Sequence, residues 1–176
     1  MSTAPQRKIL PRCIEPRRLA NQGVTLTGEI AAEQCNRLAG AVLQIIAPIT
    51  ASLQFDLDEQ RHRVVTGEVS TQVSIECHRC LEPMAVPLST RLSAMMVWSD
   101  DEAASVPKEF DPWVVESDSA DIIALVEEEL LLALPIVNYH PEDKCSGAAG
   151  YSTGAIDEPE QSGRKNPFDV LARLKQ

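Results

Sequence analysis

Alternating hydrophobic and polar residues predict several β-strands in the first hundred residues. The clearest run is 49–57, where Ile, Ala, Leu, Phe and Leu occupy every second position, and similar alternation covers 24–30, 63–76 and 84–98. A period of two places the apolar side chains on one face of a sheet. Because a short polar turn at 58–61 joins two of these runs, we expect antiparallel hairpins arranged as a meander.

A period close to four residues predicts the principal helix over 119–134. Its apolar side chains recur at every fourth position, and Pro135 ends the run. Asp118 and Asp121 are expected at the N-cap and the N3 position, where acidic side chains favour a helix start. Glu129 falls near the apolar stripe. We expect its carboxylate to stay exposed at the edge of that stripe, rather than to act as a functional acid, because charged groups are seldom buried.

The segments between these elements complete one α+β domain. Residues 31–39 favour a short helix that ends at Gly40 in the left-handed conformation. Residues 99–112 are acidic, contain two prolines and predict a surface connection, and 113–116 predict a short strand. A chain of 176 residues has the length of a single domain. We therefore expect a core at 19–137 that consists of a mainly antiparallel β-sheet covered by one long helix.

Charge is distributed so that both ends of the chain are basic and the middle is acidic. Residues 1–18 form a predicted flexible basic arm of net charge +4, and residues 164–176 carry +3, whereas 19–163 carry −17. Residues 138–165 have no sustained period and predict a flexible acidic loop. A short C-terminal helix is predicted at 166–176, and it needs a surface to dock on because so few residues are not stably helical alone.

The composition excludes several classes of partner. The formal net charge of −10 argues against electrostatic coating of RNA, DNA or anionic lipid, and 4% aromatic residues are too few for extensive base stacking. No apolar run approaches the ~20 residues of a membrane span, and the N-terminus lacks the apolar stretch of a signal peptide. We therefore expect a soluble, cytoplasmic protein with no membrane partner.

Two cysteines at C-x-x-C spacing, Cys77 and Cys80, are the sharpest chemical feature of the chain. They lie between two predicted strands, and a tight turn can direct both thiolates at one tetrahedral soft ion such as zinc. His140 and Cys145, beyond the principal helix, could complete a Cys3His set. Unliganded structural cysteines and thiol redox chemistry are the alternatives, although the β-rich flanks differ from the helix that a thioredoxin motif opens. No cofactor is certain from the sequence, and zinc is the candidate.

No sequence template for catalysis is present, so we expect a protein that is not an enzyme and has no small-molecule substrate. The phosphate-binding loop, the dinucleotide fingerprint, the serine-hydrolase elbow and the zinc-protease helix motif are all missing. The acidic groups at 100–101 and 127–129 are explained as linker charge and as the solvated side of a helix. His62, between two arginines in a turn, is expected to be solvated.

Three stretches, in this order, resemble a known family: ECHRCL at 76–81, DIIALVEEELLLALPIV at 121–137 and NPFDVLARLK at 166–175. They are similar to the YceD family, the large ribosomal RNA subunit accumulation proteins of bacteria and plastids. The resemblance covers almost the whole chain. Many members carry further cysteines after the long helix, whereas residues 146–150 of this chain supply no second C-x-x-C.

The resemblance implies a non-enzymatic factor that supports the synthesis, processing or stability of 23S rRNA during large-subunit assembly. Its partner would be the precursor large ribosomal subunit, through 23S rRNA, basic ribosomal proteins or both. The acidic body would lie beside a basic ribosomal protein while basic side chains reach phosphates. A zinc-stabilised or thiol-redox protein, and an acidic chaperone for one basic ribosomal protein, are the alternatives. The candidate contact residues are Arg7, Lys8, Arg12, Arg17, Arg18, Arg164, Lys165, Arg173 and Lys175.

Overall fold

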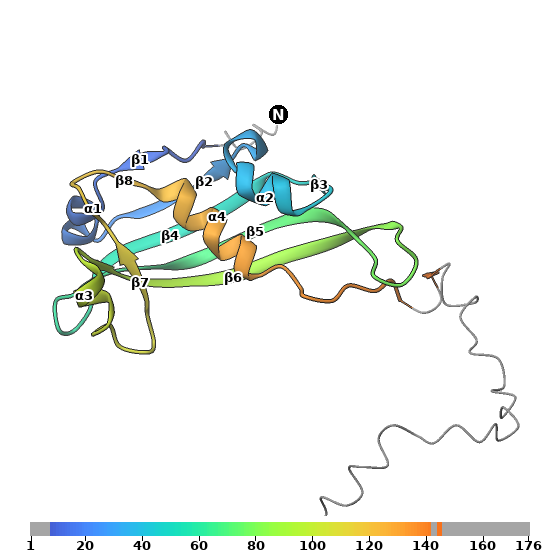
Figure 1. The fold of residues 1–176 in the computed structure, drawn as a ribbon. Coiled ribbons are helices and arrows are strands. Elements are labelled where there is room, and N and C mark those ends of the chain that lie inside the picture. Colours follow the sequence, from blue (N-terminus) through green and yellow to red (C-terminus); the bar gives the residue numbers. More distant parts are fainter. Residues whose placement is uncertain (1–7, 142–143, 146–176) are drawn as a thin grey trace, which may run out of the picture.

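The computed structural model describes residues 8–141 and 144–145, which form an α+β fold around one mainly antiparallel sheet (Figure 1). The strands are β1 (Cys13–Ile14), β2 (Thr25–Ile30), β3 (Gln44–Ile45), β4 (Ile49–Leu57), β5 (Arg63–Glu76), β6 (Pro83–Val97), β7 (Asp111–Val114) and β8 (Ala120–Asp121). The helices are α1 (Pro16–Gln22), the short 3-10 helix η1 (Ala32–Gln34), α2 (Asn36–Ala41), α3 (Asp100–Ala103) and α4 (Ile122–Leu132). Helices α2 and α4 lie on the same face of the sheet (Figure 1).

The sheet has the strand order β2-β4-β5-β6-β7, and β3 pairs with the far end of β5. The predicted meander is confirmed for β4, β5 and β6, which are joined by short turns and pair antiparallel from Leu57↔Arg63 and from Glu76↔Pro83. The sheet is mainly antiparallel, as predicted, and the exception is β7, which runs parallel to β6. The parallel pairing is possible because residues 98–110, including α3, form a crossover. This crossover is long enough to bring the chain back beside Ala94 before β7 begins.

The hydrophobic core lies between the sheet and the helices on its covered face. Phe55, Val65 and Val69 point to this face from β4 and β5, and Val126 and Leu130 meet them from α4; all five are 0% exposed. Burial of one such side chain contributes about 1.5–3 kcal/mol to folding. Apolar residues at every second position of the strands and at every fourth position of the helix therefore face each other, and they form the sheet layer and the helix layer that the sequence predicted.

Helix α4 begins later than the sequence pattern predicted, and its cap is a different residue. Asp121 is the N-cap, because its Oδ1 accepts hydrogen bonds from the backbone N–H groups of Ile123 (3.0 Å) and Ala124 (3.1 Å). Asp118 is therefore not the cap. The physical reason is the pairing of β8 with β1, which keeps the backbone extended up to Asp121.

The described part of the predicted basic arm packs against the body of the protein. Leu10 is 2% exposed, and its N–H donates to the carbonyl of Glu29 at 2.9 Å. Lys8 approaches β2 so closely that its carbonyl oxygen leaves no room for a side chain at Gly28. The structure thus differs from a flexible arm over residues 8–18, because Leu10, Ile14 and Pro16 are buried while the basic side chains between them stay mostly at the surface.

The helix predicted over 31–39 is split into η1 and α2, and Gly40 lies inside α2 rather than at a left-handed C-terminus. A buried carboxylate explains where α2 starts. Glu127 Oε1 accepts hydrogen bonds from the backbone N–H groups of Arg37 (2.7 Å) and Leu38 (3.0 Å), and Oε2 lies 3.2 Å from Arg37 Nε. Glu127 therefore caps α2 from another helix, although α2 has no cap of its own.

The expectation that the acidic groups of α4 are solvated is wrong for two of the three. Glu127 is 6% exposed and Glu129 is 9% exposed. Burial, followed by the negative charges of Asp111 and Glu128, raises the pKa of Glu129. The sequence contains a signal for Glu127, since it lies four residues after the buried Ile123 and so falls on the apolar stripe.

The predicted C-terminal helix and most of the predicted acidic loop lie outside the described residues. Within the part of the chain that the structure describes, no helix combines the length and the apolar character needed to cross a bilayer.

Candidate metal centre

The C-x-x-C motif forms the turn that joins β5 to β6. The N–H of Cys77 donates to the carbonyl of Glu82 at 3.0 Å, and the N–H of Leu81 donates to the carbonyl of Cys77 at 2.9 Å. Leu81 adopts the left-handed conformation, with φ of 61°, which closes the turn. Both sulfurs are thereby held at the tip of the hairpin, with Cys77 fully buried and Cys80 half-buried.

The segment after α4 runs toward the end of this hairpin (Figure 1). It brings His140 and Cys145 to the turn that holds Cys77 and Cys80. The N–H of His78 donates to the carbonyl of Asn138 at 2.8 Å, and the N–H of His140 donates to the Cys77 sulfur at 3.4 Å. Backbone contacts between distant segments therefore align the two halves of the predicted ligand set.

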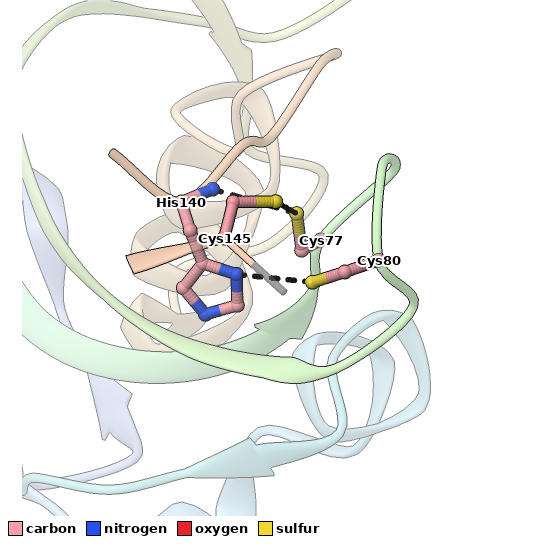
Figure 2. A group of neighbouring side chains, drawn as sticks. All are labelled: Cys77, Cys80, His140 and Cys145. Carbon is pink, nitrogen blue, oxygen red and sulfur yellow. Dashed lines mark hydrogen bonds between the residues drawn. The ribbon is translucent and has the colours of Figure 1, made fainter. Parts of the chain in front are cut away.

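The four side chains predicted as metal ligands come together in one cluster (Figure 2). Their ligand atoms all lie within 4.8 Å of one another. Cys77 Sγ is 4.0 Å from Cys145 Sγ, and Cys80 Sγ is 3.3 Å from His140 Nδ1. Zinc bonds of about 2.3 Å to sulfur and 2.0–2.1 Å to nitrogen place tetrahedral donors about 3.8 Å (S···S) and about 3.5 Å (S···N) apart. The group can therefore hold a metal ion with little rearrangement.

The electrostatic surroundings favour the thiolate form that binds a metal ion. Burial raises the pKa of the Cys77 thiol, but hydrogen bonds from the backbone N–H groups of Cys80, His140 and Arg79 outweigh it and bring the pKa down to about 5. Hydrogen bonds with the two cysteine side chains raise the pKa of His140. A thiolate at neutral pH is the state that coordinates zinc, so Cys77 is prepared for this role.

The two remaining cysteines lie away from the cluster. Cys35 is buried beneath α2, and burial together with the negative charge of Glu127 raises its pKa to about 11. Cys13 is exposed on β1. Neither joins the metal-ligand group, so the structure selects the same four residues as the sequence did.

The predicted RNA-contact residues are distributed less tightly, and several already have partners. Arg12 Nε is 2.9 Å from Asp121, Arg17 Nη1 is 3.8 Å from Asp118, and Arg18 Nη1 is 3.7 Å from Glu15. Lys8 is exposed. Arg7, Arg164, Lys165, Arg173 and Lys175 lie outside the described residues.

Comparison with known proteins agrees with the resemblance seen in the sequence. Residues 65–175 match the family model described as "Large ribosomal RNA subunit accumulation protein YceD". A curated protein of that name from Haemophilus influenzae is 34% identical over 172 residues, which cover 97% of this chain and 99% of the relative. No solved structure matches the chain. The match covers both halves of the cysteine–histidine cluster, and the chain belongs to the YceD family of large ribosomal RNA subunit accumulation proteins.

Proposed function

We propose that the protein is a non-enzymatic ribosome biogenesis factor that supports the synthesis, processing or stability of 23S rRNA in large-subunit assembly. The observation that carries this proposal is the match along 97% of the chain to a protein named for large ribosomal RNA subunit accumulation. The family is named for the accumulation of that RNA and not for a catalysed reaction. A factor that acts on nascent ribosomes would work in the cytoplasm.

The partner that we propose is the precursor large subunit, contacted through rRNA, basic ribosomal proteins or both. Among the described residues, 20 Asp and Glu side chains face only 11 Lys and Arg. Such a surface attracts basic proteins and repels bare RNA, so RNA contacts have to be local. Lys8 is a candidate for such a contact. The basic residues outside the described part of the chain remain predicted RNA contacts. We therefore expect association with particles and only weak binding to naked RNA.

Cosedimentation tests this proposal. Lysate made gently at low salt is separated on a sucrose gradient, and the full-length chain is followed across the fractions. We expect it with precursor large subunits, and we expect cells that lack it to accumulate fewer mature ones. Recovery of the protein only from the free fractions, together with a normal yield of large subunits in its absence, would refute the proposal.

We also propose that zinc occupies the cluster of Cys77, Cys80, His140 and Cys145 in a structural role. The support is the number and kind of donors, because four protein ligands close a tetrahedral site and leave no open position for a substrate. The ion would fix the segment after α4 to the tip of the β5–β6 hairpin. This role is compatible with the ribosomal function and does not depend on it.

The acidic-chaperone alternative differs in its partner. A pull-down from lysate, with and without nuclease, separates the two functions. A chaperone for one basic ribosomal protein would keep that protein after nuclease treatment, whereas a factor that contacts rRNA in the precursor would lose most of its co-purifying proteins. Thiol redox catalysis is tested separately, since it requires turnover of a disulfide substrate that Cys80→Ser abolishes.

A further inference from the structure

A pocket of about 630 Å³ opens where the β4–β5 turn meets the connection after β6. Its lining includes the charged residues Arg61, Arg63 and Asp101 and the apolar residues Met95 and Trp98. The cavity is large enough for a small organic ligand, and it combines a few charged groups with apolar walls. It is separate from the cysteine–histidine cluster and shares no residue with it.

Two arginines in this pocket have no side-chain partner among the described residues. Nε of Arg63 is shielded from solvent and makes no hydrogen bond, which is costly for a charged donor. Arg61 adopts the left-handed conformation, with φ of 65°, which is uncommon for a residue other than glycine. Asp58 does not neutralise them, because its carboxylate is engaged by the backbone N–H (2.7 Å) and Nδ1 (2.8 Å) of His62. His62 is thus held in the turn instead of being free in solvent.

The same pocket is also lined by an aromatic residue, Trp98, and by an acidic one, Asp101. Trp98 is half-buried, and the guanidinium of Arg17 stacks on its ring at 3.7 Å from the centroid. Glu102 is occupied, since its Oε2 accepts the N–H of Trp98 at 2.8 Å. Asp101 is exposed and has no partner among the described side chains, so its two oxygens are available to a ligand.

We propose that this pocket binds one guanine nucleotide of single-stranded RNA. Unpaired guanidinium groups match phosphate oxygens, which accept several N–H donors at once. The apolar walls that Met95 and Trp98 contribute to the pocket suit a planar base. Guanine presents two adjacent donors, N1–H and N2–H, to a carboxylate, whereas uracil lacks such a pair, so Asp101 gives preference for guanine. The choice of RNA as the source of the nucleotide rests on the proposed function. The pocket would give that function one defined contact with RNA.

The pocket offers a local attraction that the overall charge opposes. The net charge of −10 prevents general coating of RNA, so binding is weak and limited to the contacts made in this pocket. For single strands the logarithm of the binding constant falls with the logarithm of salt concentration by about 0.7 for each phosphate neutralised. One bound nucleotide brings one phosphate to Arg61 and Arg63, so the slope is about −0.7.

Fluorescence titration of the full-length chain tests the proposal. The chain has two tryptophans, so the variant Trp113→Phe leaves Trp98 as the reporter. The probes are seven-nucleotide RNAs of uridine with guanosine, adenosine or uridine at the centre, and GMP and inorganic phosphate alone. Arg63→Ala is compared with Arg91→Ala, a matched control whose side chain is exposed on β6 and lies 3.6 Å from Glu68. Circular dichroism and thermal melting verify that each variant is folded.

We expect the guanosine-containing RNA to quench Trp98 emission in a saturable way. Arg63→Ala should weaken this binding at least about tenfold, the loss expected when one charged hydrogen-bonded contact is removed, and Arg91→Ala should leave it unchanged. Asp101→Asn should abolish the preference for guanosine over uridine without weakening the all-uridine RNA.

Three results would overturn the inference: no quenching, equal losses in the two arginine variants, or binding of inorganic phosphate alone as tight as that of the guanosine-containing RNA. Failure of the proposed function is a different outcome. If wild-type protein still cosediments with precursor particles while the pocket binds no RNA, only the inference about this pocket fails.

Discussion

One carboxylate connects two helices that are ninety residues apart in the sequence. Glu127 on α4 accepts hydrogen bonds from the backbone N–H groups of Arg37 and Leu38 in the first turn of α2, and it also pairs with the guanidinium of Arg37. The same guanidinium lies 3.1 Å from the carboxylate of Glu128. Hydrogen bonds to an ionised acceptor contribute about 1.5–3 kcal/mol each when they are protected from water. A buried acid at this position is therefore a structural group, and its cost of burial is offset by three donors.

Replacement of this acid should lower stability more than replacement of its neighbour. We expect Glu127→Gln to reduce the free energy of unfolding by about 1–3 kcal/mol, because an amide keeps the shape but loses the charge. Glu128→Gln is the control, since that side chain is 61% exposed and its pairing with Arg37 is worth about 0–1 kcal/mol. Urea denaturation measures both. Equal losses would show that the cap does not depend on the charge.

Glu129 makes the stability of the protein depend on pH. Its pKa is raised in the folded protein, so folding favours the protonated form. The favourable contribution is complete below the unfolded pKa, about 4.3, and is lost as the pH rises through the raised folded pKa. We expect Glu129→Gln to lose less stability than wild type over this interval. Denaturation at a series of pH values measures the difference, with the exposed Glu33→Gln as the control. Parallel curves for wild type and Glu129→Gln would contradict it.

At the scale of elements, the hairpin of β5 and β6 depends on a segment more than fifty residues further along the chain. The hairpin tip and the segment after α4 are joined by two hydrogen bonds between His78 and Asn138 and by the cysteine–histidine cluster. One bond runs from the His78 N–H to the Asn138 carbonyl, and the other from the Asn138 N–H to Nδ1 of His78. Arg79 also lies over the ring of Tyr139, 5.0 Å from its centroid. The tip has few core contacts of its own, so an ion in the cluster would supply much of its order.

Removal of the metal should therefore loosen this region selectively. We expect about one zinc ion per chain in the purified protein, and chelation or Cys80→Ser should release it and lower stability. At a free zinc concentration 100 times the dissociation constant, the bound ion contributes about 2.7 kcal/mol. Hydrogen exchange should then accelerate at 77–81 and 136–141 and not in β4. Cys13→Ser, an exposed cysteine outside the cluster, is the matched control. A chain that binds no metal and is indifferent to Cys80→Ser would exclude the zinc proposal.

At the scale of the whole molecule, the described residues carry nearly twice as many acidic as basic side chains. A body of this charge is not drawn to an RNA-rich particle by long-range attraction to phosphate, so the proposed association would depend on short-range contacts and on basic ribosomal proteins. Contacts of both kinds would be between exposed charges, whose attraction salt weakens and largely screens beyond about one Debye length, ~10 Å at 0.1 M.

Association with precursor particles should accordingly be lost as salt is raised. We expect the fraction of protein that cosediments to fall several-fold between 50 and 200 mM potassium chloride, because exposed ion pairs are screened in this range. The gradient profile at each salt concentration measures it. Persistence of the complex at high salt would indicate an apolar interface instead of a charged one.

Local patterns predicted much of the sheet and its covering helix, because each strand exposes one face and buries the other. They could not predict the parallel pairing of β7, which depends on where the crossover at 98–110 lands. The four metal-ligand candidates were predicted from the C-x-x-C spacing and from the kind of residues that follow the principal helix, and the structure brings them together. The pairing of Arg37 with Glu127 was missed, since a long-range ion pair leaves no periodic signal in either segment. The pocket at Arg61 and Arg63 was missed because its walls come from a turn and from a distant connection.

The pairing of β1 with β8 has a consequence for the order in which the protein is made. Cys13 and Ile14 leave the ribosome early in translation, but their partners Ala120 and Asp121 follow more than a hundred residues later. Until then β1 has no strand to pair with, although residues 8–10 can already bond to β2 and the strands β2, β4 and β5 can associate. The pairing of β1 therefore waits until the segment that carries β8 has been made, and this edge of the fold closes after the central strands.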